Sequence, residues 1–528
     1  MNLDRLMERA LELIGRSSDI VYGDIRILGA AKREGLAVKN GIVEAASRSE
    51  TSGFGIRVLS SKGAWGFASS AGLEKSDVAL YDELHRAFRK AVALATAGGR
   101  GRTCPLALAP REAAPGNYVH FYESPYRENP FMVPVEEKLA LLLKWDAAMN
   151  ESSGKLTVRK SAMSFWMNAE VFAAFERGIG TFEARQEFWG GNILVSATAS
   201  DGAEVQTMTP WGFDGRHFIG GYEIVRGLTA LTTRRVDVLS AARAAAEDAE
   251  ALLLADECPE GEMDVIIMPD HLGLHVHETC HGFEGDRLLG YEETYIGGTF
   301  LSRHFAEIGS YRFGSEHVSI VSDATMPGGY GTFAFDDEGT PGQKVYLVED
   351  GIYRNMMTSR ETVPQLNAML GRRYFKGSNG TARASSFNRV PLIRMTNASL
   401  LPGSYSLEEL IDRVKRGILL TNTVSWSMSE DRKNFDFSLS KGVEIVDGKL
   451  GRLLKHPGYT GDNSKFWHSC AGVADARHSR VINFPNCGKG LPGQAMSTGH
   501  GSSPALFTGV RVYNRKGHSA LSLLSKGR

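Results

Sequence analysis

Two histidines and a glutamate between residues 277 and 281 are the clearest candidates for chemistry in this chain. His277, Glu278 and His281 match the pattern H-E-x-x-H in the sequence HETCH. Residues four apart lie on one face of a helix, so both imidazoles can reach the same metal ion. The carboxylate of Glu278 then points at the open coordination position, where it can accept a proton from water. The spacing therefore indicates a metal-dependent hydrolase.

A catalytic zinc ion usually has three protein ligands, so a third residue must join the two histidines. Four carboxylates follow closely in the sequence: Glu284, Asp286, Glu292 and Glu293. The distant candidate is Cys487, whose Gly- and Pro-rich surroundings are typical of a loop that can present a thiolate. Cys280 stands between the histidines but points away from their shared face, and we interpret His271 and His275 as ordinary polar residues nearby. The residues alone leave the choice of third ligand open.

The segments around the motif predict the elements that must position it. Residues 264–269, DVIIMP, indicate a short buried strand directly before the motif. Beyond residue 315 the pattern favours strands and Gly-rich turns, with one helix at 406–417. The expected fold class is α+β, with an N-terminal α/β layered domain over 1–255 and a β-rich, metal-binding C-terminal domain over 256–528.

The N-terminal half mixes the periods of helices and strands. Helices are expected at 3–16, 75–97, 134–149 and 242–257, and antiparallel strands at 156–208. Asn40 and Gly41 predict a hairpin turn, and Ser76 is a candidate N-cap. A long surface connection is expected near 97–132, where Gly, Pro and polar residues occur without period.

Composition excludes several classes of protein. The 60 Lys and Arg residues balance 61 Asp and Glu residues, which argues against a nucleic-acid binder or a polybasic membrane-surface protein. Five cysteines without a CxxC pair favour a reducing cytoplasm. The first residues lack the apolar core of a signal peptide, and the chain lacks an apolar run long enough for a membrane span. P-loop and nucleophile-elbow patterns are also absent.

Four segments together resemble the TldD/PmbA family, in its motif-bearing, TldD-like metallopeptidase branch. They are HETCHGFEGDRLLGYEETYIGGTFL, DDEGTPGQKVYLVEDGIYRNMMTSRETV, GSNGTARASSFNRVPLIRMTNASLLPG and CGKGLPGQAMSTGHGSSP. The N-terminal strands also fit, so that the similarity covers nearly the whole chain. The usual family motif is H-E-x-x-x-H, and the motif of this chain is one residue shorter.

The resemblance implies a set of ligands and a fold. Family members bind a metal, here expected to be Zn²⁺, through the two motif histidines and the cysteine of the C-G-K loop. Carried over to this sequence, the metal ligands are His277, His281 and Cys487, and Glu278 is the catalytic residue. The C-terminal domain is expected to be barrel-like. The resemblance also implies a dimer, either a homodimer or a heterodimer with a paralogue that lacks the motif.

The function predicted on this basis is a cytoplasmic zinc peptidase that cleaves extended or unfolded peptides. Main-chain hydrogen bonds to an added strand would hold such a substrate with little demand on its sequence. One alternative is a metal-dependent hydrolase of a small amide or ester. Another is a non-catalytic subunit that binds peptides and uses the metal structurally, in which case four protein ligands would enclose the ion.

Overall fold

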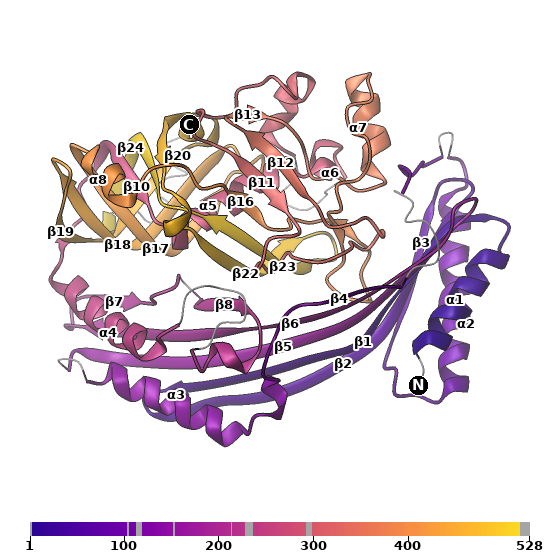
Figure 1. Cartoon of the computed structure of the whole chain (residues 1–528), viewed down its shortest axis with the longest axis horizontal. Helices are drawn as coiled ribbons and strands as arrows, with labels where there is room; N and C mark the ends of the chain where they lie inside the picture. Colours follow the sequence, from indigo (N-terminus) through magenta and orange to yellow (C-terminus); the bar gives the residue numbers. More distant parts are fainter. Residues whose placement is uncertain are drawn as a thin grey trace.

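The computed structural model describes residues 3–102, 105–111, 119–151, 154–212, 214–227, 236–291 and 298–517. The chain forms a mixed helix and strand structure, as the sequence predicts, in which a long twisted sheet lies beside a compact β-rich region (Figure 1). Glu292, Glu293 and part of the connection predicted near 97–132 lie outside the described residues.

The centre of the long sheet is built from four very long antiparallel strands, and a short strand, β4, pairs parallel at one edge. The order of the sheet is β3-β2-β1-β5-β6-β4, with β7 and β8 also paired to β6. The strands are β1 (Ile20–Lys39), β2 (Ile42–Ser60), β3 (Trp65–Ala71), β4 (Val119–Glu123), β5 (Leu156–Glu176), β6 (Gly180–Ser200), β7 (Val205–Met208) and β8 (Arg216–Ile219). The predicted turn between β1 and β2 is confirmed, because Asn40 and Gly41 have positive φ angles of 49° and 77°. Strand β4 lies within the segment predicted to be an irregular connection.

Four helices cover this sheet at its two ends (Figure 1). They are α1 (Leu3–Arg16), α2 (Asp77–Gly98), α3 (Val135–Met149) and α4 (Val238–Leu254), and all four were predicted. Ser76 caps α2 by accepting a hydrogen bond from the Ala79 amide at 3.3 Å. Helices α1 and α2 share one hydrophobic core with the sheet, and α3 and α4 share another.

A closed five-stranded barrel forms the centre of the β-rich region, as the family resemblance implies. Its strands are β10 (Gly261–Ile267), β17 (Arg416–Met428), β18 (Asn434–Val446), β20 (Pro457–Asp462) and β24 (Ala505–Asn514). Pairing of β17 with both β10 and β18 closes the circle. Because the barrel is closed, none of these five strands has an unpaired edge within it, and the barrel is a rigid support for the helix that packs against it.

Smaller elements surround the barrel. The strands are β9 (Asp256–Glu257), β11 (Ile320–Asp323), β12 (Lys344–Glu349), β13 (Ile352–Tyr353), β14 (Ala382–Arg383), β15 (Leu392–Ile393), β16 (Ala398–Leu400), β19 (Lys449–Lys455), β21 (Cys470–Val473), β22 (Arg480–Lys489) and β23 (Gln494–Ser502). The α-helices are α5 (Pro269–Cys280), α6 (Gly285–Leu288), α7 (Thr362–Leu370), α8 (Leu407–Asp412) and α9 (Asn463–Phe466). The prediction of a single helix beyond residue 315 is wrong, because α7 and α9 accompany α8. Both are too short for apolar periodicity to reveal.

Charged side chains lie buried or half-buried where the long sheet meets the β-rich region. Arg26 of β1 lies 3.8 Å from the Asp337 carboxylate and donates to the Ser386 carbonyl at 3.4 Å. Glu170 of β5 accepts a hydrogen bond from Asn168 at 3.1 Å, and burial raises the pKa of Glu170 to about 7. These residues line a small cavity of about 110 Å³. Among the described helices, none has the length and apolar character required to cross a bilayer.

Candidate metal centre

The motif lies on α5, a helix enclosed by protein. Strand β10 runs directly into it, and Pro269 occupies the first helical turn, where its missing amide proton costs nothing. Every residue from His271 to Cys280 is buried, because the helix lies between the barrel and the β22–β23 hairpin (Figure 1). This packing fixes the direction of each side chain on the helix.

His271 and His275 lie on the barrel side of α5, away from the metal motif. His271 contacts the Thr423 hydroxyl and the Tyr459 hydroxyl, each at 2.8 Å. His275 contacts the same Tyr459 hydroxyl at 2.9 Å and the Asn463 side-chain oxygen at 3.0 Å. Burial lowers the pKa of both imidazoles, that of His275 to about 3, so both are neutral. They anchor the helix, which is a more specific role than the sequence suggested.

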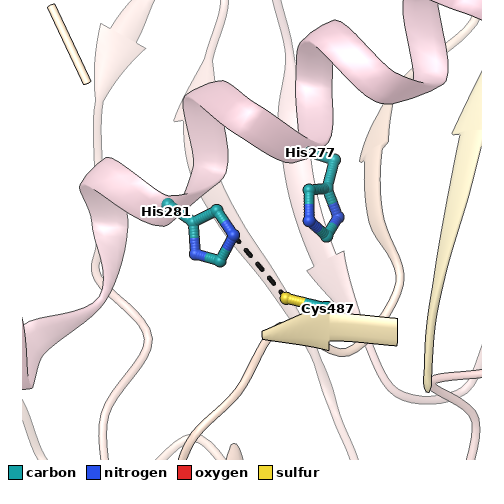
Figure 2. Close-up of side chains that lie close together, drawn as sticks. All are labelled: His277, His281 and Cys487. Atoms are coloured by element: carbon teal, nitrogen blue, oxygen red, sulfur yellow. Dashed lines mark hydrogen bonds between the residues drawn. The ribbon is translucent and has the colours of Figure 1, made fainter. Parts of the chain in front are cut away.

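The opposite face of α5, together with the 3-10 turn His281–Phe283 that continues it, brings His277 and His281 to Cys487, a residue of β22 (Figure 2). One ligand atom from each of the three residues lies within 4.8 Å of the others, and all three side chains are buried. The Cys487 sulfur lies 3.6 Å from Nε2 of His281. The three residues that the resemblance implies as ligands therefore lie together, although Cys487 is distant from the histidines in the sequence.

His500 fixes the tautomer of His277. Nδ1 of His500 lies 2.7 Å from the Ala398 carbonyl, to which it must donate its proton. Nε2 of His500 is then an acceptor, and Nδ1 of His277 lies 2.8 Å from it. His277 therefore carries its proton on Nδ1 and directs the lone pair of Nε2 toward the other two ligands. Burial lowers the pKa of His277 to about 4, which keeps the ring neutral, as a metal ligand must be.

Glu284 performs the equivalent task for His281. Its carboxylate accepts from Nδ1 of His281 at 3.2 Å and from Arg287 at 2.6 Å, and Lys489 lies 3.1 Å away. Burial alone would raise the pKa of Glu284, but Lys489, His281 and Arg287 hold it well below its usual range. Nε2 of His281 is thus left to face the Cys487 sulfur, the arrangement usual for metal-binding histidines.

Cys487 is suited to be a thiolate. It follows an irregularity in the pairing of β22 with β23 between Phe484 and Cys487, a feature that can redirect a side chain next to a functional site. Burial would raise the pKa of the thiol, but His281 and Arg394 outweigh burial and lower it. By contrast, burial raises the pKa of the Cys280 thiol, which lies in the hydrophobic core as expected.

Glu278 lies beside the three candidate ligands, and two side chains hold its carboxylate. Trp426 donates its indole proton to one oxygen at 2.9 Å, and Arg432 donates to the other. Arg432 has a φ of 64°, a conformation that is unfavourable for a residue with a side chain. This backbone conformation accompanies the contact between the Arg432 guanidinium and the Glu278 carboxylate.

A pocket of about 580 Å³ gives access to this centre. Its walls include the candidate ligands, Glu278, Trp426, Arg432, Phe484 and the turn around Ser429. The donor set of two imidazoles and one thiolate fits Zn²⁺, and the pocket beside it leaves room for a further, non-protein ligand.

Sequence reasoning missed three contributors to the centre. His500, Trp426 and Arg432 come from β23, β17 and the turn after β17. His500 lies within the fourth segment that resembles the family, so that segment was the available signal, whereas Trp426 and Arg432 lie outside all four segments. Two of the local carboxylates considered as ligands have other roles. Glu284 accepts a hydrogen bond from Nδ1 of His281, the ring nitrogen that faces away from Cys487, and Asp286 forms an ion pair with Lys489 at 2.8 Å. The four-residue spacing of His277 and His281 places both rings on one face of a single turn, at a centroid distance of 4.9 Å.

Comparisons with known proteins agree with this fold and identify relatives of the chain. A metalloprotease of Methanocaldococcus jannaschii is 27% identical over 442 residues, which are 84% of this chain and 87% of the relative. A zinc metalloprotease TldD homolog of Saccharolobus solfataricus is 29% identical over 204 residues, which are 38% of this chain and 41% of the relative. The crystal structure of TldE from Thermococcus kodakarensis has the same fold, with a TM-score of 0.64, 15% identity and coverage of 97% of this chain and 100% of that one.

Two family models match the chain in order. The PmbA/TldA metallopeptidase domain 1 matches residues 24–95, and the PmbA/TldA metallopeptidase C-terminal domain matches residues 260–512. The second match contains the entire candidate metal centre and the barrel around it. Together the matched residues make up more than half of the sequence, and the chain belongs to the PmbA/TldD family of metallopeptidases.

Proposed function

We propose that this protein is a zinc-dependent peptidase that cleaves extended or unfolded peptides, with His277, His281 and Cys487 as metal ligands. The observation that carries the proposal is the convergence of two neutral imidazoles and one thiol beside the carboxylate of Glu278, at the base of an open pocket. A purely structural site would not require a carboxylate at that position. The name of the Saccharolobus solfataricus relative supports zinc.

In this proposal each side chain has a distinct task. A bound zinc ion would polarise the scissile carbonyl and make a water molecule easier to deprotonate. Glu278 accepts the proton of the attacking water and passes it to the leaving amine, as a general base and then a general acid. Trp426 and Arg432 hold the Glu278 carboxylate in one orientation. His500 and Glu284 keep the ligand histidines in the tautomers that leave Nε2 available.

The proposed substrate strand lies along β22. Within the described residues β22 pairs in a ladder only with β23, although Asn483 of β22 also contacts the His217 carbonyl of β8 at 3.3 Å. The part of the other edge near Cys487 is the part that we propose an extended peptide uses. Cys487 lies on this strand, which brings the edge directly to the metal centre. Binding through backbone groups would suit peptides of many sequences, whereas a small amide or ester would leave most of the edge unused.

We also propose a homodimer. Residues 42–51, the first half of β2, are exposed, and β3 covers the outer edge of β2 only from Gly53 onward. A long uncovered strand edge favours pairing with another chain unless charges or bulges prevent it. A second copy of the same chain is the simplest partner for this edge, because closed two-fold symmetry is the commonest assembly of soluble proteins.

Metal analysis combined with a cleavage assay tests the proposed function. The purified protein should contain about one zinc ion per chain and cleave an unstructured peptide, and a chelator should abolish cleavage. Glu278→Gln should retain the metal and lose cleavage by about 10²–10⁴-fold, because glutamine cannot accept the proton. His277→Ala should lose both metal and activity. If metal-loaded Glu278→Gln cleaved peptides at the wild-type rate, Glu278 would be excluded as the general base. If the wild-type protein cleaved small amides but not peptides, the alternative of a metal-dependent hydrolase of small amides or esters would be favoured.

A further inference from the structure

Arg432 belongs to the turn between β17 and β18, in the wall of the metal pocket. Only 6% of its side chain is exposed. The turn is fixed on both sides of this residue: the Arg432 amide donates to the Ser429 carbonyl at 2.9 Å, and the Asn463 side chain donates to the Arg432 carbonyl at 2.7 Å. Asn463 also contacts His275 of α5 at 3.0 Å. The guanidinium is therefore held at a set position relative to the helix that carries the motif.

Arg432 uses only one nitrogen of its guanidinium. Nη1 donates to one oxygen of Glu278, and the indole of Trp426 donates to the other oxygen. Trp426 thus occupies the oxygen that a two-pronged pair of arginine and carboxylate would need. Nε is buried without a hydrogen-bond partner, and Nη2 donates no hydrogen bond to any described residue. Unused donors on a buried guanidinium are costly, so they indicate a place for a ligand.

The unused nitrogen Nη2 lies near the place where a scissile carbonyl must bind. A general base contacts the attacking water at about 3 Å, and the water approaches the carbonyl carbon to about 3 Å. Glu278 and Arg432 touch each other and line the same pocket, so the carbonyl oxygen of a bound peptide is expected within reach of Nη2. Among the described residues that line this pocket, Arg432 is the only arginine or lysine.

We propose that Arg432 is a second catalytic residue, which donates a hydrogen bond to the carbonyl oxygen of the scissile bond as this oxygen becomes negatively charged. The inference rests on the proposed function and adds a residue to its chemistry. The water oxygen forms a bond to the carbonyl carbon with one of its lone pairs, an O–H bond of the water breaks, and the proton goes to Glu278. The π electron pair of the carbonyl moves onto the carbonyl oxygen.

Arg432 is placed to follow this transfer of charge. Before the attack the negative charge is on the Glu278 carboxylate, which Nη1 of Arg432 contacts. After the attack Glu278 is neutral and the charge is on the substrate oxygen, for which Nη2 is available. One rigid guanidinium serves both without reorienting, and a donor fixed in advance stabilises the transition state more than the ground state. Loss of one such donor typically lowers kcat about 10²–10³-fold.

A binding experiment separates this role from the contact of Arg432 with Glu278. Every protein carries Glu278→Gln, which has no carboxylate to orient and cleaves slowly compared with the measurement. Two unstructured peptides of one sequence are the probes: the ordinary peptide, and an analogue in which a phosphinate group replaces the scissile amide. The phosphinate is tetrahedral and anionic, like the transition state. Calorimetry gives both affinities, and the metal content and thermal midpoint of each variant are measured.

Arg432→Gln should weaken binding of the phosphinate about 10–100-fold and leave the affinity for the ordinary peptide nearly unchanged, because the ordinary peptide has no anionic oxygen at that place. Arg432→Lys keeps the charge but lacks the fork of donors, so it should recover part of the loss. Lys433→Gln is the matched control. Lys433 is the next residue, is 42% exposed and lies 3.5 Å from Asp462, so its substitution should change neither affinity.

Two results would overturn the inference: an equal loss of affinity for both peptides in Arg432→Gln, or no loss for the phosphinate. If Arg432→Gln has a low thermal midpoint or reduced metal content, Arg432→Lys decides by the same two results. Because binding is measured without turnover, a selective loss for the phosphinate in a protein that cleaves no peptide would contradict only the proposed function. A protein that cleaves peptides and binds the phosphinate equally well with and without Arg432 would contradict only this inference.

Discussion

Nδ1 of His277 lies 2.8 Å from Nε2 of His500, and this contact leaves Nε2 of His277 to face Cys487. The orientation of the first candidate ligand therefore depends on a residue of another strand, β23. His500 is itself held by the Ala398 carbonyl, so the imidazole pair has one arrangement of protons.

Removal of His500 should weaken metal binding without removing a ligand. We expect His500→Leu to lower zinc affinity about 10–100-fold, because His277 then loses the acceptor that fixes its tautomer. Competition with a chromophoric chelator measures this affinity. His304→Leu, a substitution of a partly exposed histidine, is the control and should bind zinc like the wild type. Unchanged zinc affinity in His500→Leu would show that the contact has no role in orienting His277.

Cys487→Ser tests the third ligand. Serine has a similar shape, but its hydroxyl stays protonated and is a poor ligand for zinc, so the variant should retain much less than one zinc ion per chain after dialysis. Cys470→Ser is a suitable control, since Cys470 is another buried cysteine, outside the candidate metal group. Stoichiometric zinc in Cys487→Ser would exclude this residue as a ligand.

The half-buried carboxyl of Glu170, which lines the small cavity between the long sheet and the β-rich region, should make stability depend on pH. Its pKa of about 7 in the folded protein lies above the ordinary value of 4.5, so between these values the folded state holds a proton that the unfolded chain has released. Stability is therefore lost as pH rises through this window, by an amount on the order of 3 kcal/mol.

Glu170→Gln should abolish that loss. The thermal midpoint of Glu170→Gln minus that of the wild type should therefore be larger at pH 8 than at pH 5. Glu44→Gln, at a partly exposed site on β2, should show no such trend. A constant difference between Glu170→Gln and the wild type at both pH values would contradict the expected protonation of Glu170.

The proposed homodimer can be tested at the uncovered part of β2. Light scattering at micromolar concentration should give about twice the mass of one chain, and a mass near 57.6 kDa would contradict the proposal. Ile42→Lys should favour the monomer, because Ile42 is 72% exposed on this edge and a lysine there opposes strand pairing. Val78→Lys changes an equally exposed residue of α2 and should leave the mass unchanged.

Local patterns predicted the parts of the structure that depend on local forces. The Asn40-Gly41 turn, the Ser76 cap and the helical spacing of His277 and His281 each lie within a few residues of sequence. The roles of Arg432 and His500 depend on contacts with residues about 150 to 220 positions away, which periodicity does not encode. Cys487 was one of several candidates for the third ligand, and resemblance to a family selected it, because a single cysteine in a Gly-rich segment carries no spacing signal of its own.

Closure of the barrel also determines when the metal centre can fold while the chain is being translated. Strand β10 pairs with β24, which emerges from the ribosome about 250 residues later, so contact order in this region is high and folding is expected to be slow. Until β24 arrives, α5 lacks a complete barrel around it and its buried histidines remain exposed to solvent. The nascent chain therefore acquires an ordered metal centre only after β24 has been synthesised, and a chain that stops short of β24 lacks the closed barrel that holds α5.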